Sequence, residues 1–151
     1  MTAGTLCNRD VVVAIKSEGI VDAARRMRTL HVGDLVVVDP TPAGPVPVGI
    51  VTDRDIVVEV VAGAPDHIDY LLVGDVMTAN VVTAREDISV AAALKTMEVH
   101  GVRRLPLVDA SGVLTGILTL DDILPHLTVE SRQDALGIVA AEQRRERTSR
   151  P

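Results

Sequence analysis

Gly49-Ile-Val-Thr-Asp-Arg-Asp-Ile56 decides the fold, because the chain nearly repeats this stretch as Gly116-Ile-Leu-Thr-Leu-Asp-Asp-Ile123. Both stretches run glycine, two branched aliphatic residues, threonine, two variable residues, aspartate and isoleucine. Upstream, residues 11–39 align without gaps on residues 81–109 at an offset of 70, which then falls to 67. The extra residues of the first copy fall in the Pro- and Gly-rich segment 41–47, where a loop tolerates an insertion. The chain is therefore one duplicated unit, and the two copies are expected to pack on each other.

The composition predicts a compact protein with an aliphatic core. The chain has 151 residues, of which 47% are hydrophobic, with no Trp or Phe and one Tyr. This length allows a substantial core, and the many Val and Ile residues favour buried strands. The formal charge of −6 argues against non-specific binding to nucleic acid, for which a basic surface is expected.

The same sequence gives an expectation for the cellular compartment. Cys7 is the single cysteine, which excludes an intramolecular disulfide and indicates a reducing compartment. No charged-then-apolar signal segment opens the chain, and no apolar run approaches the ~18 residues of a membrane helix. We expect a soluble cytoplasmic protein that binds neither membrane nor nucleic acid.

Hydrophobic periodicity predicts the order β-α-β-β-α in each copy. A short strand at residues 11–15 precedes a helical pattern at residues 20–30, and residues 90–97 repeat the pattern with Ser89 as N-cap. A hairpin and a helix follow, at residues 35–39, 48–51 and 53–61 and again at 105–109, 114–118 and 120–127. The fold class is α/β in the broad sense (α+β), a duplicated β-α-β-β-α unit.

These elements divide the chain into five segments: a lead-in at 1–9, the first unit at 10–62, a linker at 63–74, the second unit at 75–128, and a C-terminal helix and tail at 129–151. The lead-in carries little signal and is expected to be loosely held. In the last segment, Leu136, Val139 and Ala140 share one side of a predicted helix over 131–147. Residues 144–147 are expected to be a solvated, frayed end.

Two β-α-β-β-α units that each close on G-h-h-T-x-x-D-h (h, apolar), with Asp75-Val-Met-Thr78 before the second, resemble a tandem pair of CBS (cystathionine β-synthase) domains over residues 10–127. No catalytic domain is attached, so the resemblance is to stand-alone bacterial CBS-pair proteins. It implies a pseudo-twofold pair with two clefts that bind adenosine-containing ligands such as AMP, ADP, ATP, NAD or S-adenosylmethionine. It also implies a homodimer.

The Thr-x-x-Asp motif has two interpretations. As a ligand site, the carboxylate of Asp55 or Asp122 could accept hydrogen bonds from both ribose hydroxyls, each worth about 1.5–3 kcal/mol. Thr52 and Thr119 could then bind the sugar or a phosphate. As a structural motif, Thr-x-x-Asp at a strand-to-helix turn is a capping box, in which the carboxylate reaches back to the backbone. Both interpretations stay open, and the carboxylate oxygens would have to be shared if both held.

Phosphate recognition requires local positive charge in this acidic chain. The helix that follows each motif offers free N–H groups and its positive end to an anion. Arg54, Arg103 and Arg104 are candidate cations, although each could instead form a surface ion pair. Gly33 stands where the second copy has Arg103, so the two clefts should differ in affinity, and the scarcity of cations favours AMP or a dinucleotide over ATP. The remaining candidates for ribose and phosphate are Asp53 and Asp121.

The base pocket must have aliphatic walls, because the chain has almost no aromatic residues. Thr83 could form a hydrogen bond with the base edge, which its counterpart Val13 cannot. Core packing is the competing interpretation for the lining residues. The full candidate lining is Val13, Ala14, Ile15, Val37, Thr83, Ala84 and Pro106.

Other chemistries find less support in the sequence. The four His residues show no metal-ligand spacing, so no metal site is expected. No nucleophile–base pair is apparent, so we expect no enzyme and no catalytic cofactor. The sequence predicts a regulatory protein that binds an adenine nucleotide, and the alternative is a ligand-free scaffold for protein–protein interaction.

Overall fold

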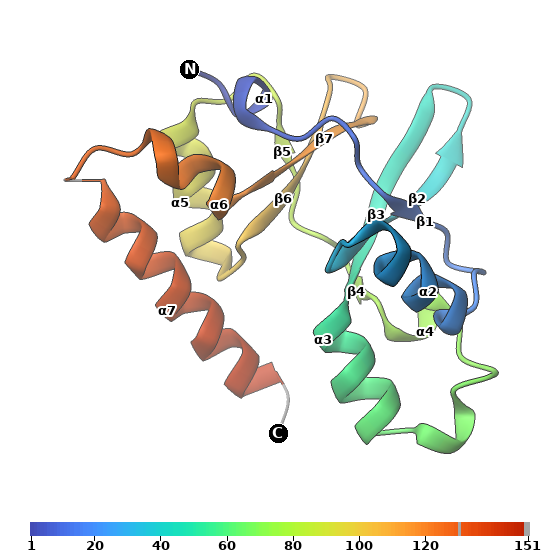
Figure 1. The fold of residues 1–151 in the computed structure, drawn as a ribbon. Helices are drawn as coiled ribbons and strands as arrows, with labels where there is room; N and C mark the ends of the chain where they lie inside the picture. Colours follow the sequence, from blue (N-terminus) through green and yellow to red (C-terminus); the bar gives the residue numbers. More distant parts are fainter. Residues whose placement is uncertain (130, 150–151) are drawn as a thin grey trace. The chain divides into compact units, whose positions relative to one another are not determined.

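The computed structural model describes residues 1–129 and 131–149, and it contains two sheets and several helices (Figure 1). The mixed α+β fold class expected from the sequence is confirmed. The chain forms two compact units. The first-copy unit contains Val11–Val81, and the second-copy unit joins Met1–Asp10 to the described residues from Val82 onward.

The first-copy unit is built on a sheet with the strand order β1-β2-β3-β4. Its strands are β1 (Val13–Ala14), β2 (Asp34–Thr41), β3 (Gly44–Thr52) and β4 (Thr78–Ala79), and its helices are α2 (Ile20–Leu30), α3 (Asp53–Asp55), η1 (Ile56–Ala62), η2 (Pro65–His67) and α4 (Val73–Val76). Because α2 connects them, β1 and β2 are parallel, whereas β2, β3 and β4 are antiparallel neighbours. Ile20, Ala23 and Met27 of α2, spaced by three and four residues, pack into the core with the buried strand residues.

The second-copy unit repeats this plan with the sheet order β5-β6-β7. Its strands are β5 (Ala84–Arg85), β6 (Arg104–Val108) and β7 (Leu114–Thr119), and its helices are α1 (Ala3–Leu6), α5 (Val90–His100), α6 (Leu120–Ile123), η3 (Leu124–His126) and α7 (Arg132–Ser149). The Ser89 hydroxyl accepts a hydrogen bond from the Ala92 N–H at 3.1 Å, which confirms Ser89 as the N-cap of α5. Ala93, Leu94 and Met97 supply the buried stripe of this helix.

The insertion in the first copy lengthens a hairpin. We expected a loop at residues 41–47, but β2 continues to Thr41 and β3 begins at Gly44. Pro40 and Pro45 are paired residues near the tip of the hairpin, and the register shifts once, between Val37 and Val38. The expectation was wrong because proline is tolerated at sheet edges and bulges, where its missing N–H breaks no ladder.

The lead-in is part of a core. Ala3 is fully buried and packs in the hydrophobic cluster of the second-copy unit, so the expectation of a loosely held segment was wrong. The Ala3 and Gly4 N–H groups donate to the carbonyls of Ile88 and Glu86, both at 2.8 Å. The Arg9 guanidinium also binds the Glu86 carboxylate, at 2.6 Å. Backbone pairing and a small apolar side chain hold the segment, and neither gives a periodic sequence signal.

The same arrangement recurs in the segment before the second copy. The bonds that α1 makes are repeated by α4 at an offset of 70, where Val73 donates to Glu18 at 2.8 Å and Gly74 donates to Lys16 at 3.0 Å. The duplication therefore extends back to residues 3 and 73. We call residues 1–10 and residues 73–79 the lead segments, and each packs with the copy that it does not precede. Met1–Asp10 belongs to the second-copy unit, whereas α4 and β4 belong to the first-copy unit.

These lead segments explain the glycine that opens each Gly-h-h-Thr motif. A Cβ atom on Gly49 would lie 2.6 Å from Met77 Sδ and 2.9 Å from the Thr78 carbonyl oxygen. A Cβ atom on Gly116 would lie 2.6 Å from Cys7 Sγ. Glycine is favoured at both positions because a neighbouring segment with a sulfur side chain runs alongside the strand there, at the edge of the sheet.

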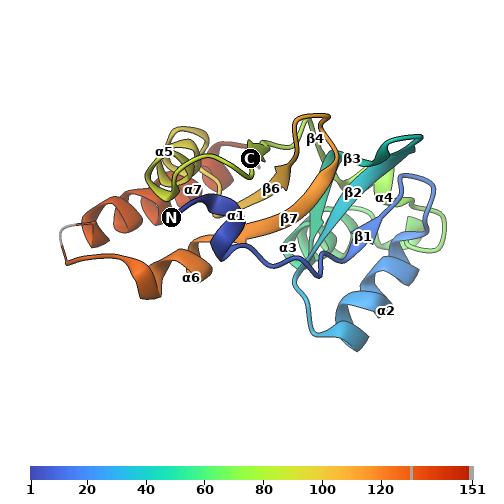
Figure 2. The ribbon, with the colours of Figure 1, turned by 90° about the horizontal axis from the view of Figure 1, so that it is seen from above.

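α7 lies alongside α5 and completes the second core (Figure 2). Its buried residues are Ala135 and Ile138, whereas Leu136 is 70% exposed. The prediction that Leu136 belongs to the apolar side of this helix was therefore wrong. Successive residues of a helix point about 100° apart, so Leu136 points away from the direction of the buried Ala135. Of the solvated, frayed end expected at residues 144–147, the fraying was wrong, since the helix continues to Ser149, whereas Arg144, Arg145 and Arg147 are exposed as expected. None of the helices in the described ranges combines the length and apolar character of a membrane span.

Candidate functional site

The first Thr-x-x-Asp motif forms the turn from β3 into α3. The Thr52 hydroxyl accepts a hydrogen bond from the Asp55 N–H at 3.1 Å, and Asp55 Oδ2 accepts one from the Thr52 N–H at 2.8 Å. Thr52 has an extended backbone, whereas the next residues are helical, as a capping box requires. Asp55 is only 4% exposed. This turn is therefore fixed by two reciprocal hydrogen bonds, each between a side chain and a backbone N–H group.

The second motif has the same geometry with an additional bond. The Thr119 hydroxyl accepts from the Asp122 N–H at 3.2 Å, and Asp122 Oδ2 accepts from the Thr119 N–H at 2.8 Å. The Thr119 hydroxyl also donates to Asp122 Oδ2 at 2.7 Å. Asp122 is half-buried, so this carboxylate keeps more exposed surface than the carboxylate of Asp55.

The capping-box interpretation is thus confirmed for both motifs. The cap uses only part of the hydrogen-bond acceptor capacity of each carboxylate, because an ionised carboxylate offers about four lone-pair sites on its two oxygens. In both motifs the threonine N–H donates to Oδ2 of the carboxylate. The ribose interpretation therefore requires a hydroxyl at Oδ1 of the same carboxylate, with the cap left in place.

The helix starts differ from the expected anion site. In α3, the first N–H groups donate within the protein: Asp53 to the Gly33 carbonyl at 3.0 Å, Arg54 to Asp53 Oδ1 at 2.8 Å, and Asp55 to Thr52. The expectation of free N–H groups was wrong for these residues because the turn satisfies its own donors.

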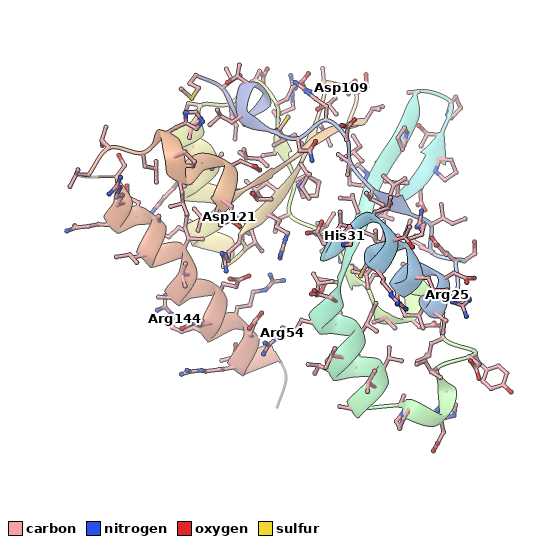
Figure 3. The ribbon with its side chains drawn as sticks, in the orientation of Figure 1. Arg25, His31, Arg54, Asp109, Asp121 and Arg144 are labelled. Carbon is pink, nitrogen blue, oxygen red and sulfur yellow. The ribbon has the colours of Figure 1, made fainter. Side chains whose placement is uncertain are left out.

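At the start of α6, two N–H groups likewise donate within the protein. Leu120 donates to the Arg103 carbonyl at 2.9 Å, and Asp122 donates to the Thr119 hydroxyl. Asp121 lies on α6 and is exposed (Figure 3). A phosphate at either turn would therefore rely on side-chain cations more than on backbone donors.

Of the candidate cations, Arg103 is engaged by carboxylates. Arg103 lies between two carboxylates, with Nη2 3.7 Å from Asp121 Oδ1 and Nε 3.5 Å from Glu142 Oε2. The ion-pair interpretation is thus confirmed for Arg103. Arg104 begins β6 opposite Thr119 on β7, and Arg54 lies exposed in α3. In the first-copy unit, Gly33 takes the position of Arg103, as the sequence indicates.

Glu142 is the residue that sequence reasoning missed. It lies on α7 seven residues after Ala135 and four after Ile138, so it continues the buried stripe of the helix. Its side chain is 21% exposed. Burial raises the pKa of the Glu142 carboxyl above its usual range, and the Arg103 guanidinium partly offsets this rise. The sequence shows the spacing of the buried stripe, but it does not show that Glu142 lies near Arg103.

The candidate base-lining residues fall into two groups. Ala14 pairs with Val37 across the parallel β1–β2 ladder, and both are buried. Pro106 is also buried, on β6. These three offer little or no surface to a ligand. The residues with exposed or partly exposed surface are Val13, Ile15, Thr83 and Ala84.

Residues 1–129 and 131–149 contain no group of three or more His, Cys, Asp or Glu side chains placed to hold a metal ion. Each unit therefore has its own candidate ligand turn, from a strand into a helix, with one capping carboxylate.

Comparison with known proteins identifies the duplicated unit. The protein-family model described as CBS domain matches residues 3–62 and 73–128. An uncharacterised protein of Methanopyrus kandleri is 38% identical over 137 residues, covering 89% of this chain and 68% of that protein. The uncharacterised protein YlbB of Bacillus subtilis is 35% identical over 142 residues, covering 93% of each chain.

Solved structures share the fold. A CBS domain protein of Thermoplasma acidophilum aligns with a TM-score of 0.78 at 24% identity, covering 95% of this chain and 76% of that one. The structure of CBSX2 in complex with AMP has a TM-score of 0.71 at 26% identity, covering 83% and 95%. The CBS domain pair of MJ0100, in complex with 5′-methylthioadenosine and S-adenosyl-L-methionine, has a TM-score of 0.70 at 25% identity, covering 83% and 98%. The duplicated chain described here therefore belongs to the CBS domain family, as a tandem pair of CBS domains.

Proposed function

We propose that this CBS pair is a non-catalytic regulatory module that binds an adenosine-containing ligand at a Thr-x-x-Asp turn. Two structural neighbours support this proposal, because one was solved with AMP and another with 5′-methylthioadenosine and S-adenosyl-L-methionine. The part these ligands share is adenosine. The recognition chemistry should therefore address the ribose and the base, which AMP, ADP, ATP and NAD also contain.

The single observation that carries the proposal is the geometry of Asp122. Its Oδ2 is held by the backbone and hydroxyl of Thr119, which fixes the orientation of the carboxylate before any ligand arrives. A carboxylate that is already fixed loses little conformational entropy when it binds a ribose hydroxyl. Asp122 is also half-buried, where a charge-assisted hydrogen bond is stronger than it is in water.

Asp55 is the less favourable of the two carboxylates. It is 4% exposed, so a ribose could reach it only after the surrounding residues moved. We therefore assign the stronger ligand site to the second-copy turn. Thr83 and Ala84, which have accessible surface in the same unit, are proposed to contact the base. The proposed regulation is linkage, in which the ligand favours the conformation of the chain that binds it best.

The competing function is a scaffold that binds a protein partner and no ligand. The confirmed capping boxes favour this reading to the extent that they explain Thr-x-x-Asp without a ligand. We also propose, from the family resemblance and the single cysteine, a homodimer that works in the cytoplasm. Sedimentation of the purified chain at two concentrations would measure its oligomeric state.

The decisive substitution is Asp122→Asn, because it separates the cap from the ligand. The amide oxygen of asparagine still accepts from the Thr119 N–H, whereas its NH2 group cannot accept a ribose hydroxyl. Calorimetric titration with AMP, ATP, NAD, 5′-methylthioadenosine and S-adenosylmethionine should show saturable binding to the native chain. Asp122→Asn should weaken that binding by at least about tenfold, the loss of one good hydrogen bond.

Asp75→Asn is the matched control. Asp75 Oδ2 accepts a hydrogen bond from the Leu72 N–H at 2.9 Å, so it is a third capping carboxylate with no predicted ligand role. This variant should bind as the native chain does. If ligand-free, folded native protein binds none of the ligands, the scaffold replaces the sensor as the better function.

A further inference from the structure

α7 brings a carboxylate to Arg103, one of the predicted phosphate cations of the second-copy turn. The match to the CBS domain family model ends at residue 128, so Glu142, on α7, lies outside it. Its Oε2 is 3.5 Å from Arg103 Nε, inside the second-copy unit. The Arg103 carbonyl in turn accepts from the N–H of Leu120, the first residue of α6. Glu142 is thus connected to the proposed ligand turn through a single arginine.

The position of Glu142 is fixed by the packing of its helix. Ala135 and Ile138 anchor α7 in the core. Near Glu142, the helix approaches α5 so closely that a Cβ atom on Gly101 would lie 3.0 Å from the Ala141 carbonyl oxygen. Glu142 therefore cannot be moved aside as a residue on a loose tail could. Any anion that approaches Arg103 has to compete with a carboxylate that the fold holds in place.

The surrounding charges do not favour a phosphate either. The turn itself carries the carboxylates of Asp121 and Asp122, and Glu142 on α7 contacts its Arg103. The further charges that act on Glu142 are those of Glu146, Arg104 and Arg145. The acidic groups therefore outnumber the basic ones. A 5′-phosphate would add up to two further negative charges, because its second pKa is about 6. The N–H groups of Leu120 and Asp122, which could have compensated, are already bonded.

We propose that Glu142 is a specificity-determining residue, which makes the second-copy turn select adenosine ligands whose 5′ substituent is uncharged or cationic over 5′-phosphates. This inference rests on the proposed function, and it narrows the ligand class to adenosine thioethers and sulfonium compounds. The Glu142 carboxylate repels a phosphate and attracts a sulfonium cation. It neither repels nor attracts an uncharged thioether. Glu142 acts through Arg103 and through the local field, without contact to the ribose.

AMP and 5′-methylthioadenosine form a matched pair of probes, because they share adenosine and differ at the 5′ position. Calorimetry at pH 8, well above the second phosphate pKa of about 6, keeps AMP doubly charged. The native chain should bind 5′-methylthioadenosine at least about tenfold more tightly than AMP. Glu142→Gln should raise the affinity for AMP about tenfold, equivalent to about 1.4 kcal/mol, and leave that for 5′-methylthioadenosine unchanged.

Two further variants assign the effect to the ion pair. Asp134→Asn removes one negative charge from the same helix about 12 Å away, at 1.5 Å per residue, and should change neither affinity. Arg103→Met in the Glu142→Gln background should return the AMP affinity to the native level, since the gain requires the released guanidinium. A thermal melt of each variant confirms that it is folded.

The outcomes separate this inference from the proposed function. If both probes bind and Glu142→Gln leaves their affinity ratio unchanged, the specificity role is overturned while the sensor stands. An equal gain in Asp134→Asn would also overturn it, because the effect would then be net charge alone. If neither probe nor S-adenosylmethionine binds any folded variant, both the sensor and the specificity role are overturned.

Discussion

Thr119 and Asp122 exchange three hydrogen bonds across one helical turn. The Asp122 N–H donates to the Thr119 hydroxyl, while Asp122 Oδ2 accepts both the Thr119 N–H at 2.8 Å and that same hydroxyl at 2.7 Å. The hydroxyl is therefore donor and acceptor to a single residue. This pair fixes the direction in which α6 leaves β7. It thereby also fixes the orientation of the Asp122 carboxylate, which is proposed to bind the ribose.

Thr119→Ala should lower the free energy of unfolding by about 0.5–2 kcal/mol, because it leaves the Asp122 N–H and one carboxylate lone pair without their partner. Thr119→Ser keeps the hydroxyl and should recover most of the loss. Urea denaturation measures both. Equal stability of the alanine variant and the native chain would contradict the structural role of the cap.

Gly116→Ala should destabilise the second-copy unit by about 1–3 kcal/mol through overpacking, since the new methyl group would overlap Cys7 Sγ. Cys7→Ala in the same chain removes the sulfur atom and should restore part of the stability. The corresponding pair in the first copy should behave differently. A Cβ atom on Gly49 would lie 2.9 Å from the Thr78 carbonyl oxygen, closer than the 3.1 Å between a Cβ atom on Gly116 and the Asn8 carbonyl oxygen, so Met77→Ala should rescue Gly49→Ala less well. Rescue to the same extent in both copies would show that the backbone contact has no effect.

His31 and Gly101 end equivalent helices in the left-handed backbone region, with φ of 55° and 61°. A non-glycine residue pays about 1–2 kcal/mol there, which the extra flexibility of unfolded glycine, about 0.5–1 kcal/mol, partly cancels. His31→Gly should therefore be neutral or slightly stabilising. Gly101→Ala should destabilise, because its methyl group would also press on α7 at the Ala141 carbonyl. Thermal unfolding compares the two variants, and a more stable Gly101→Ala chain would contradict the close packing of α7.

The raised pKa of Glu142 gives stability a pH dependence of known sign. A carboxyl group whose pKa is higher in the folded than in the unfolded chain stabilises the fold below the unfolded value, ordinarily 4.5, and that contribution is lost as pH rises through the folded value. As pH rises through this window, the free energy of unfolding of the native chain should fall relative to that of Glu142→Gln. Denaturation of both proteins at several pH values from 4 to 8 measures the difference. A difference that stays constant with pH would contradict the burial of Glu142.

The repeat made much of the fold predictable. Residues such as Ser89, Thr52 and Thr119 act through neighbours a few positions away, so their spacing contains the information and their capping roles follow from it. Hydrophobic stripes with regular periods likewise located α2 and α5. These interactions are local in sequence, and sequence patterns report them directly.

The parts that could not be predicted depend on contacts between distant residues. Ala3 packs in the second core and Arg9 binds Glu86, yet nothing in residues 1–10 indicates which partner they have. The contact of Glu142 with Arg103 likewise joins residues on different elements. Side-chain exposure along α7 was misjudged because Leu136 is the larger apolar residue, whereas the close approach to α5 favours the smaller Ala135.

The reciprocal placement of the lead segments bears on how a duplicated protein of this kind can arise. β4 covers the edge of β3 in the first-copy unit, and Asn8 bridges to Ile117 on β7 in the second. A polypeptide with one copy would have to take its edge segment from another molecule, because an uncovered edge invites association. Two such molecules that exchanged lead segments would reproduce both units seen here, as domain-swapped dimers do. Gene fusion would then convert an exchange between two chains into an exchange within one, and would make the pairing independent of protein concentration.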